Sequence, residues 1–481
     1  MQLSRKLLHN LDFLQAQLGV GVTFDVVVRE FSIGGKDAAM VFLDGFIKDT
    51  LAADIMRRLQ QVQRAEIVPR VVGKLVAEQI AHIEVEVVAS TEDLVEQVLA
   101  GQLGLLIDGE TTAVVIDVRT YPSRSIEEPD LERVTRGSRD GFVETLVFNT
   151  ALIRRRVRDS GLRFEMLKVG ARSKTDVVIA YISDLADAQR VSLLKARIQA
   201  TKVDALVMGA KSLEELLFPR SLNPLPQVRF TERPDVVAAH LYEGHIIILT
   251  DTTPMAMIVP VTLFHFTQHA EEYLQAPAVG TYLRWVRSLA LFLALFLTPL
   301  WLALFQQKQS LPQFLHFIGP RQSSTVPVAL QFLILEVGLD LIRMALIHTP
   351  GSLATSLGIV GAILLGDLAV QVGLFVPETI LYTAVVAICS FAIPSIEFSL
   401  AIRLFRYFLL LAAAFFRLPG LLVGSVVVLV FIAQTNSLGV PYMWPLLPLA
   451  SGPLLRLVIR YPVPQVRYRP IFAGGKDKDV R

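Results

Sequence analysis

Cysteine is almost absent from this 481-residue chain, which contains a single one, Cys389, inside an apolar run. A disulfide needs two cysteines and a cysteine-based metal site needs several, so neither can be built. The two glycine-rich patterns that cradle nucleotide phosphates, G-x-G-x-x-G and G-x-x-x-x-G-K-[ST], are also missing. The sequence therefore excludes a disulfide-stapled fold and a cysteine-ligated metal centre, and it carries neither nucleotide-binding fingerprint.

Charge is scarce in the second half of the chain. Residues 1–283 contain 31 Lys and Arg against 37 Asp and Glu, whereas residues 284–481 contain 15 against 7, so the halves carry −6 and +8. A hydrophobic fraction of 53% is too high for two soluble domains of this total length. Residues 1–10 lack the pattern of a secretory signal, which predicts that the N-terminal half stays in the cytoplasm.

Long uncharged runs predict membrane-spanning helices. The first run, residues 288–307, follows Arg284, Trp285 and Arg287, a basic and aromatic anchor typical of the cytoplasmic side. Further spans are expected at residues 326–347, 354–375, 379–397, 404–435 (kinked) and 443–459 (Pro-rich). Six crossings place both termini in the cytoplasm, in agreement with the basic tail. A total of four crossings is the alternative, if two of these segments are re-entrant.

Alternating β-branched and aromatic residues predict an α/β fold for the soluble half. The expected hairpins are residues 23–33 with 38–46, 103–107 with 113–121, and 245–250 with 255–261, and the other expected strands are 164–169, 175–182 and 204–208. Helices are expected at residues 49–63, 90–100, 140–159, 186–199, 212–217 and 236–242.

Four domains follow from these patterns. We expect two soluble α/β subdomains at residues 1–122 and 123–283, an α-helical polytopic transmembrane domain of four to six crossings at 284–460, and a basic cytoplasmic tail at 461–481.

A block of arginines ends the helix expected at residues 140–159, where cations favour the helix dipole. Acids lie close to it in the sequence, and charge blocks are usually solvated or paired. We therefore expect a clamp between the subdomains or between subunits, rather than a ligand site. The net charge of −6 disfavours nucleic acid as a partner. The clamp residues are Glu128, Glu132, Arg136, Glu144, Arg154, Arg155, Arg156 and Arg158.

The same stretch, residues 125–158, resembles the segment that marks A subunits of the GerA-type spore germination receptor family. The matching residues are Glu128-Pro129, Glu132, Arg136-Gly137, Gly141-Phe142, Glu144, Asn149, Leu152 and Arg154-Arg155-Arg156. Residues 18–50 and the wording YPSRSIEEPD are most similar to the stage V sporulation protein AF branch of this family. The resemblance implies a spore inner-membrane protein that assists ion release, assembles as a homo-oligomeric ring and works with other germination membrane proteins.

Polar residues inside the membrane half suggest an ion path. Glu336, Asp340 and Arg343 fall on one helical face within an apolar run, and Asp367 supplies a second free acid. A path lined by Glu336 and Asp367 would favour cations. The alternative is self-neutralisation, in which Asp340 and Arg343 pair within the helix.

Small residues recur every four positions in the third expected span and give a stripe along which another helix can pack closely. This favours tight helix packing over a hinge beside a pore. The stripe consists of Ala354, Gly358, Ala362 and Gly366.

An ion channel subunit or channel accessory accounts best for both halves. A non-conducting scaffold or interaction subunit is the alternative, and a transporter is disfavoured because no repeated helix sets are evident. We expect no enzyme activity and no cofactor. His265 and His269 are spaced for one helix face, but without the acid of an H-E-x-x-H motif they make a poor metal site.

Overall fold

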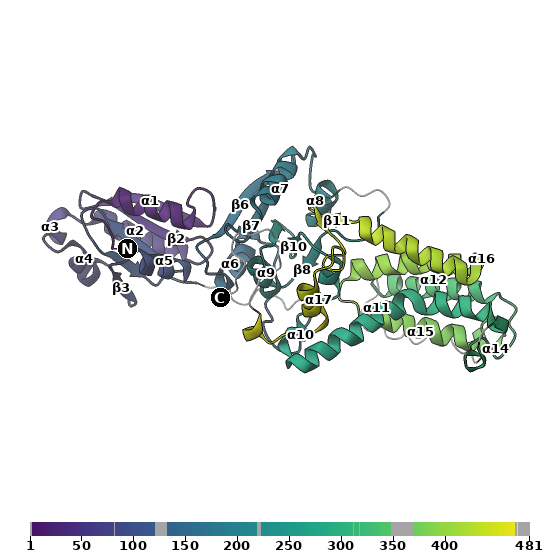
Figure 1. Cartoon of the computed structure of the whole chain (residues 1–481). Helices are drawn as coiled ribbons and strands as arrows, with labels where there is room; N and C mark the ends of the chain where they lie inside the picture. The colour runs from purple at the N-terminus through teal and green to yellow at the C-terminus, as the bar shows by residue number, and fades with distance from the viewer. Residues whose placement is uncertain are drawn as a thin grey trace. The chain divides into compact units, whose positions relative to one another are not determined.

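The computed structural model describes residues 2–80, 82–120, 132–218, 223–310, 312–316, 318–347, 369–466 and 469 (Figure 1). It contains two compact units. Unit 1 consists of Met1–Arg220, Val228–Pro260 and Pro464–Arg481, and unit 2 of Ser221–Gln227 and Val261–Val463. The four domain boundaries expected from the sequence stay predictions.

The first half of unit 1 is an antiparallel sheet of order β1-β2-β4-β5-β3 with helices around it. Its central strands are buried along their whole length, so apolar residues on both faces contribute to the core. The elements are α1 (Leu7–Leu18), β1 (Val26–Ile33), β2 (Lys36–Leu43), α2 (Asp49–Gln61), α3 (Arg64–Ile67), α4 (Val71–Lys74), a π-helical turn (Leu75–Gln79), β3 (Val85–Val88), α5 (Thr91–Leu99), β4 (Leu103–Ile107) and β5 (Ala113–Ile116).

The second half of unit 1 forms another antiparallel sheet, of order β6-β7-β9-β10-β8. Its elements are α6 (Leu146–Arg156), β6 (Leu162–Val169), β7 (Thr175–Ile182), α7 (Ala188–Ala200), α8 (Ala210–Leu217), β8 (Arg229–Thr231), α9 (Pro234–Tyr242), β9 (Ile246–Thr250) and β10 (Ala256–Val259).

The two halves of unit 1 share one topology. Each begins with a helix and a hairpin, continues through helices to an edge strand, and then places one more helix before a second hairpin. In each sheet the second hairpin lies between the first hairpin and the edge strand. Unit 1 is therefore a structural repeat in which α5 and β4 of the first copy correspond to α9 and β9 of the second.

Two expectations for the soluble half are wrong. Residues 204–208 are a loop, because the carbonyl of Asp204 accepts hydrogen bonds from the backbone N–H groups of Arg172 and Ser173 in a turn instead of pairing with a strand. The helix expected from residue 140 starts only at Leu146. The Asn149 side chain hydrogen-bonds both backbone groups of Val143, at 2.8 and 2.6 Å, and holds the preceding segment outside the helix.

Unit 2 is helical, with a short β-hairpin. Among the residues that the structure describes, α11 and α16 are the helices long and apolar enough to cross a membrane, and α15 is a shorter apolar helix. The elements are 3-10 turns at Leu263–Phe266, Lys308–Ser310, Gln313–Leu315 and Val463–Gln465, helices α10 (Glu271–Leu274), α11 (Pro277–Phe305), α12 (Val328–Ile347), α14 (Ala369–Gln371), α15 (Pro377–Phe391), α16 (Ile396–Gln434) and α17 (Ser451–Val458), and strands β11 (Asn436–Ser437) and β12 (Val440–Pro441).

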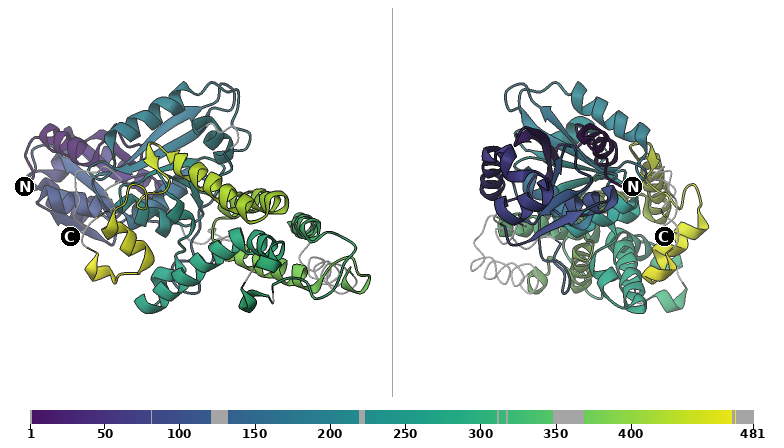
Figure 2. Two further views of the ribbon diagram at one scale, coloured as in Figure 1. Left: turned by 45° about the vertical axis from the view of Figure 1, so that its right-hand side comes forward. Right: turned by 90° about the vertical axis from the view of Figure 1, so that its left-hand side faces the viewer.

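Helix α16 is two antiparallel helices joined at Arg417, which has φ 56° and ψ −141°. The rings of Phe405 and Phe431, 26 positions apart in sequence, have centroids 6.2 Å apart, which a continuous helix could not allow. A Cβ placed on Gly424 would lie 3.1 Å from Cδ2 of Leu409. The kinked span expected at residues 404–435 is therefore wrong, because the chain reverses within it. The two halves lie next to each other in Figure 2.

Contacts fix the directions of the helices in unit 2. We call the end where α11 begins the near end and the opposite one the far end. The Gln306 side chain, just after α11, donates to the carbonyl of Ala414 at 3.4 Å, so the first half of α16 also ends at the far end. Trp301, near the end of α11, contacts Phe332 of α12 and Tyr382 of α15. Helices α12 and α15 therefore both start at the far end.

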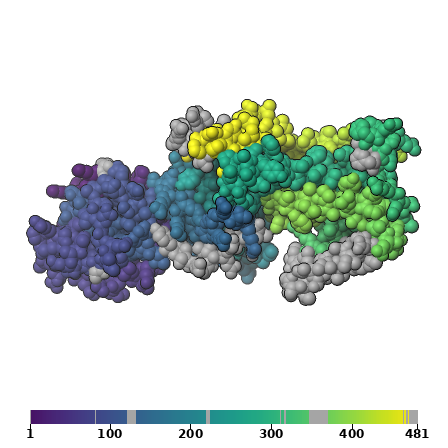
Figure 3. All heavy atoms as spheres, turned by 90° about the horizontal axis from the view of Figure 1, so that it is seen from below, coloured from purple at the N-terminus to yellow at the C-terminus, as the bar shows by residue number. Residues whose placement is uncertain are grey.

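The second half of α16 returns to the near end. The backbone N–H of Leu263, which precedes α11, donates to the carbonyl of Tyr442 at 2.8 Å. The side chain of Ser437 accepts from Val261 N–H at 3.1 Å. Helices α11, α12, α15 and the two halves of α16 lie side by side in Figure 1. Figure 3 shows the atoms of this part of the chain from below, in teal to yellow-green.

The span expected at residues 443–459 is wrong as well. Its first part is a series of turns, and α17 has only 8 residues. At 1.5 Å per residue this helix is about 12 Å long, whereas the hydrocarbon core of a bilayer is about 30 Å thick. Pro445, Pro448 and Pro453 explain the difference, since proline removes a backbone donor that a continuous helix needs.

Candidate functional site

Two acid–arginine pairs connect α12 to the first half of α16. Arg406 donates to Glu336 through Nε at 2.7 Å and through Nη2 at 2.6 Å, and both residues are 2% exposed. Asp340 forms an ion pair with Arg403 and accepts a hydrogen bond from the Tyr407 hydroxyl at 2.9 Å. Four ionisable side chains thus lie along one helix contact in an apolar bundle.

The Arg406 guanidinium also reaches a third helix. Its Nη1 donates to the carbonyl of Ala294 in α11 at 2.6 Å. A planar guanidinium with donors on several edges can hold a carboxylate in two-point contact and still bind a carbonyl. The pair therefore links α11, α12 and α16 at one point.

A buried amide connects α12 to α15. Gln331, which is fully buried, donates from Nε2 to the Ser324 hydroxyl and to the carbonyl of Val326, both at 2.7 Å. Its Oε1 accepts from Val376 N–H at 3.0 Å and from the Thr379 hydroxyl at 2.9 Å. The amide uses both of its polar ends, which fixes the start of α15 against α12.

The basic anchor expected before the first span is ion-paired. Glu272 of α10 is fully buried and pairs with both Arg284 and Arg287 of α11. Arg284 also donates to the carbonyl of Arg456 at 2.7 Å, and the Trp285 indole donates to the carbonyl of Val458 at 3.1 Å. These contacts hold α10, α11 and α17 together at the near end.

In unit 1, Arg154 joins the two halves of the repeat. It donates to Asp25 from Nε at 2.8 Å and from Nη2 at 3.1 Å, and the two residues are 1% and 3% exposed. Arg154 also donates to the carbonyls of Asp159 and Leu162, both at 3.2 Å, and lies over the ring of Phe164. Every edge of this buried guanidinium is therefore occupied.

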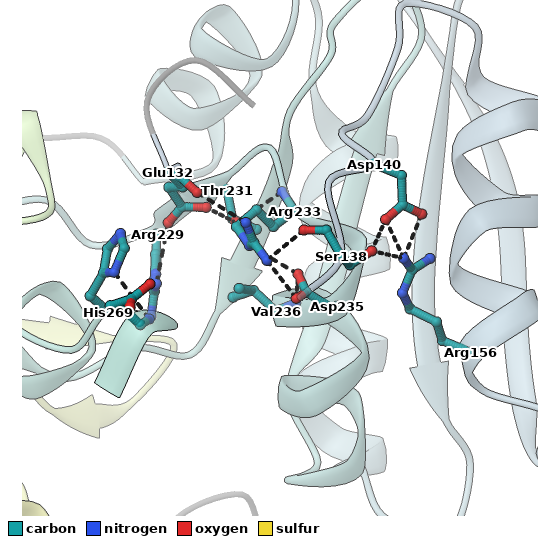
Figure 4. A network of polar contacts seen from close by, with 11 residues as sticks. Glu132, Ser138, Asp140, Arg156, Arg229, Thr231, Arg233, Asp235, Val236 and His269 are labelled. Carbon is teal, nitrogen blue, oxygen red and sulfur yellow. Dashed lines mark hydrogen bonds and ion pairs between the residues drawn. The ribbon is translucent and has the colours of Figure 1, made fainter. Parts of the chain in front are cut away.

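The segment before α6 is held by a second polar network, drawn in Figure 4. Glu132 accepts hydrogen bonds from Arg229 at 3.3 Å and from the Thr231 hydroxyl, and its backbone carbonyl accepts from Arg233 at 3.1 Å. Arg233, which is 1% exposed, also donates to the carbonyl of Ser138 at 3.2 Å. The β8 strand and the start of α9 thus anchor this segment.

Arg156 connects the same segment to α6. It pairs with Asp140 and donates to the Ser138 hydroxyl at 2.8 Å (Figure 4). Arg155, Arg158 and Arg136 are exposed, and Glu144 is exposed with its carbonyl accepting from Thr252 N–H at 2.8 Å. Of the clamp residues, the structure therefore brings Glu132, Arg154 and Arg156 into polar networks, and the clamp itself stays a prediction.

Several sequence-predicted residues lie outside the described residues. These are Glu128 of the clamp, Asp367 of the polar path, and the stripe of Ala354, Gly358, Ala362 and Gly366. Arg343 is described and half-buried, and Asp340 pairs with Arg403 rather than with Arg343.

The partners Asp25, Arg403 and Arg406 were missed by sequence reasoning. Asp25 lies within an expected strand, and nothing local marks it as the partner of a residue 129 positions away. Arg403 and Arg406 lie at the start of the span expected at residues 404–435, and neither was assigned an acid partner. Their spacing of three within an apolar run, opposite a pair of acids at spacing four, is the signal that could have linked them.

Comparisons with known proteins support the resemblance seen in the sequence. The family model described as "Bacillus/Clostridium GerA spore germination protein" matches residues 12–472. The chain is 41% identical to stage V sporulation protein AF of Bacillus subtilis (strain 168), over 98% of this chain and 95% of that protein. It is 32% identical to spore germination protein GerLA of Bacillus cereus, over 96% and 95%.

A solved structure also matches part of the chain. The N-terminal domain of the A subunit of the Bacillus megaterium spore germinant receptor GerK3 is 26% identical, with a TM-score of 0.43, over 54% of this chain and 96% of that chain.

Proposed function

Because this chain belongs to the GerA spore germination protein family, we propose that it is a spore inner-membrane subunit, or accessory, of an ion channel that promotes ion release during germination. The observation that supports this most is the set of ionisable side chains between α12 and α16. Charges at membrane depth are costly and tend to mark ion paths. Glu336 and Asp340, with Asp367, would make such a path favour cations.

The pairing of these acids suggests how the path is closed. While Arg406 and Arg403 hold Glu336 and Asp340, the carboxylates are neutralised and offer no free ligand to a cation. Movement of the first half of α16 away from α12 would expose both acids together. On this view the described arrangement is a closed state, and the signal for germination acts on the contact between these two helices.

A path through several copies fits the proposal better than a path through one. Buried side chains such as Phe332, Leu335 and Leu409 fill the space among the helices of unit 2. We therefore propose a homo-oligomeric ring in the bilayer, together with other germination membrane proteins, with no enzymatic activity, cofactor or nucleic-acid partner. A non-conducting scaffold subunit is the alternative.

Conductance of the purified full chain in planar bilayers is expected to be cation-selective. The variant Asp367→Asn and the double variant Glu336→Gln/Arg406→Gln, which removes both charges of the pair, should reduce the preference for cations by at least several-fold. Glu378→Gln is the matched control, because it removes an acid that lies outside the contact between α12 and α16. Glu378 lies in the first turn of α15 and accepts a hydrogen bond from Arg321 N–H. Absence of any conductance would favour the scaffold, and unaltered selectivity in both variants would remove these acids from the path.

Both termini are expected on the same side of the membrane. The basic flanks of the first span and of the tail support this, as do the directions of the helices. In a Cys389→Ser background, His9→Cys and Lys478→Cys should react with an impermeant maleimide from one side of oriented vesicles. Arg417→Cys, at the reversal within α16, should react only from the other side. Labelling of positions 9 and 478 from opposite sides would contradict this topology.

A further inference from the structure

The turn between α9 and β9 brings polar side chains together at a place that is ordinarily apolar. Gly244, with φ 87°, ends the helix. The N–H of His245 donates to the carbonyl of His240 at 3.0 Å, and the N–H of Gly244 donates to that of Leu241 at 3.0 Å. These two bonds define a Schellman motif, in which the residues at the positions of His240 and His245 usually make a hydrophobic contact. Here both are imidazoles.

The first copy of the repeat provides an internal comparison. The turn from α5 to β4 has the same two bonds, from Gln102 to Gln97 at 3.0 Å and from Gly101 to Val98 at 2.9 Å, with Gly101 at φ 97°. The positions of His240, Glu243 and His245 are occupied there by Gln97, Ala100 and Gln102. The motif therefore forms without ionisable side chains, and the second copy differs from the first by two imidazoles and a carboxylate.

The geometry of the three side chains fits a metal ion. Each of His240, Glu243 and His245 offers one ligand atom, and these atoms lie within 4.8 Å of one another. His245 Nε2 is 3.8 Å from Glu243 Oε2. Ligand atoms about 2.0–2.2 Å from a tetrahedral zinc ion lie roughly 3.3–3.6 Å apart, so side-chain movements of about 1 Å would close the site.

A backbone contact orients one of the two imidazole rings. His240 Nδ1 lies 2.8 Å from the carbonyl of Val236 and donates to it, so Nε2 is the ring nitrogen that would bind an ion. Such a hydrogen bond to a backbone carbonyl is the usual support of a metal-binding histidine.

Access and charge are compatible with a cation. His245 is fully buried, whereas the Glu243 side chain is 48% exposed, so an ion can enter from the carboxylate side. Arg229 lies near enough to lower the pKa of both histidines after the larger effect of burial on each ring. Its charge is balanced by Glu132 at 3.3 Å.

We propose that His240, Glu243 and His245 form a binding site for a late first-row divalent cation, with Zn²⁺ as the best match to two imidazoles and one carboxylate. Two imidazoles and one carboxylate are a ligand set that tetrahedral zinc sites use. The site belongs to unit 1 and does not depend on whether unit 2 conducts ions.

The test is zinc binding to the purified full chain in detergent, after removal of metal with a chelator. Titration calorimetry should give one Zn²⁺ per chain, and Co²⁺ should give a visible spectrum of four- or five-coordinate metal. The triple variant His240→Gln/Glu243→Ala/His245→Gln installs the residues of the first copy and should therefore keep the turn. We expect it to weaken zinc binding at least 100-fold.

His9→Gln, an exposed histidine elsewhere in unit 1, is the control and should leave binding unchanged. The single variant Glu243→Gln keeps the helix end and should weaken binding about 10-fold or more, which provides a test if the triple variant does not fold. Absence of stoichiometric binding by the native chain would overturn the proposal. So would zinc binding that is unaffected by both the triple and the single variant.

Discussion

Replacing Arg406 with glutamine is expected to lower the free energy of unfolding of the chain by about 3–5 kcal/mol, because it leaves the Glu336 carboxylate buried without its partner. Both residues are 2% exposed, so water cannot take over the lost contact without opening the bundle. The same substitution removes the hydrogen bond to the carbonyl of Ala294 in α11. Thermal unfolding of the purified chain in one detergent would measure the loss.

The double variant Glu336→Gln/Arg406→Gln should recover most of this loss, since two amides can hydrogen-bond without burying charge. Arg343→Gln is the matched control on α12, because Arg343 is half-buried and lies outside this pair. We expect that variant to change the unfolding free energy by less than about 1 kcal/mol. Equal losses of unfolding free energy for Arg406→Gln and Arg343→Gln would show that the Glu336–Arg406 pair contributes no more to stability than a charge outside it.

Replacing Asp25 with asparagine is expected to destabilise unit 1 by about 3–5 kcal/mol, because Arg154 would keep its buried charge without a counter-charge. The hydroxyl of Thr23, which donates to Asp25, would lose a charged acceptor at the same time. Arg154 would retain its bonds to the carbonyls of Asp159 and Leu162, which satisfy its donors but not its charge. Limited proteolysis of the full chain against denaturant would report the opening of unit 1.

Arg158→Gln is the control for this second prediction, since Arg158 belongs to the same arginine block and is exposed. Its loss should be about 0–1 kcal/mol. The contrast separates a buried contact between the two halves of the repeat from a general effect of positive charge. A loss below about 1 kcal/mol for Asp25→Asn would mean that Asp25 and Arg154 do not hold the halves together.

Local patterns predicted much of the soluble fold. The structure confirms the hairpins expected at residues 23–33 with 38–46 and at 103–107 with 113–121, because their turns, at Gly34-Gly35 and Asp108-Gly109, are encoded by adjacent residues. The start of α6 was misplaced because Asn149, inside the helix, holds the backbone of Val143. That contact depends on a side chain six positions away and has no periodic signature.

In the candidate sites, one residue of each buried ion pair could be predicted from the sequence, but its partner could not. Glu336 and Arg154 stood out as an acid in an apolar run and as part of a basic block, but their partners lie 70 and 129 positions away. Pairing across such distances is decided by packing, and one sequence does not contain that information. The reversal at Arg417 was hidden for another reason. Hydropathy is continuous across it, and Pro419 is equally compatible with a kink.

This reversal also affects how the chain can enter a bilayer. Its two arms, residues 396–416 and 418–434, would be about 31 and 25 Å long at 1.5 Å per residue. The tip between them carries one charge, that of Arg417. Moving an arginine to the bilayer centre costs about 2.5–3.5 kcal/mol on insertion scales, whereas each Leu, Val, Ile or Phe there contributes about −0.3 to −0.6. The second arm alone is rich enough in such residues to offset that cost. The first arm also carries Arg403 and Arg406, whose acid partners lie on α12, so on the proposed membrane placement we expect the hairpin to insert together with that helix.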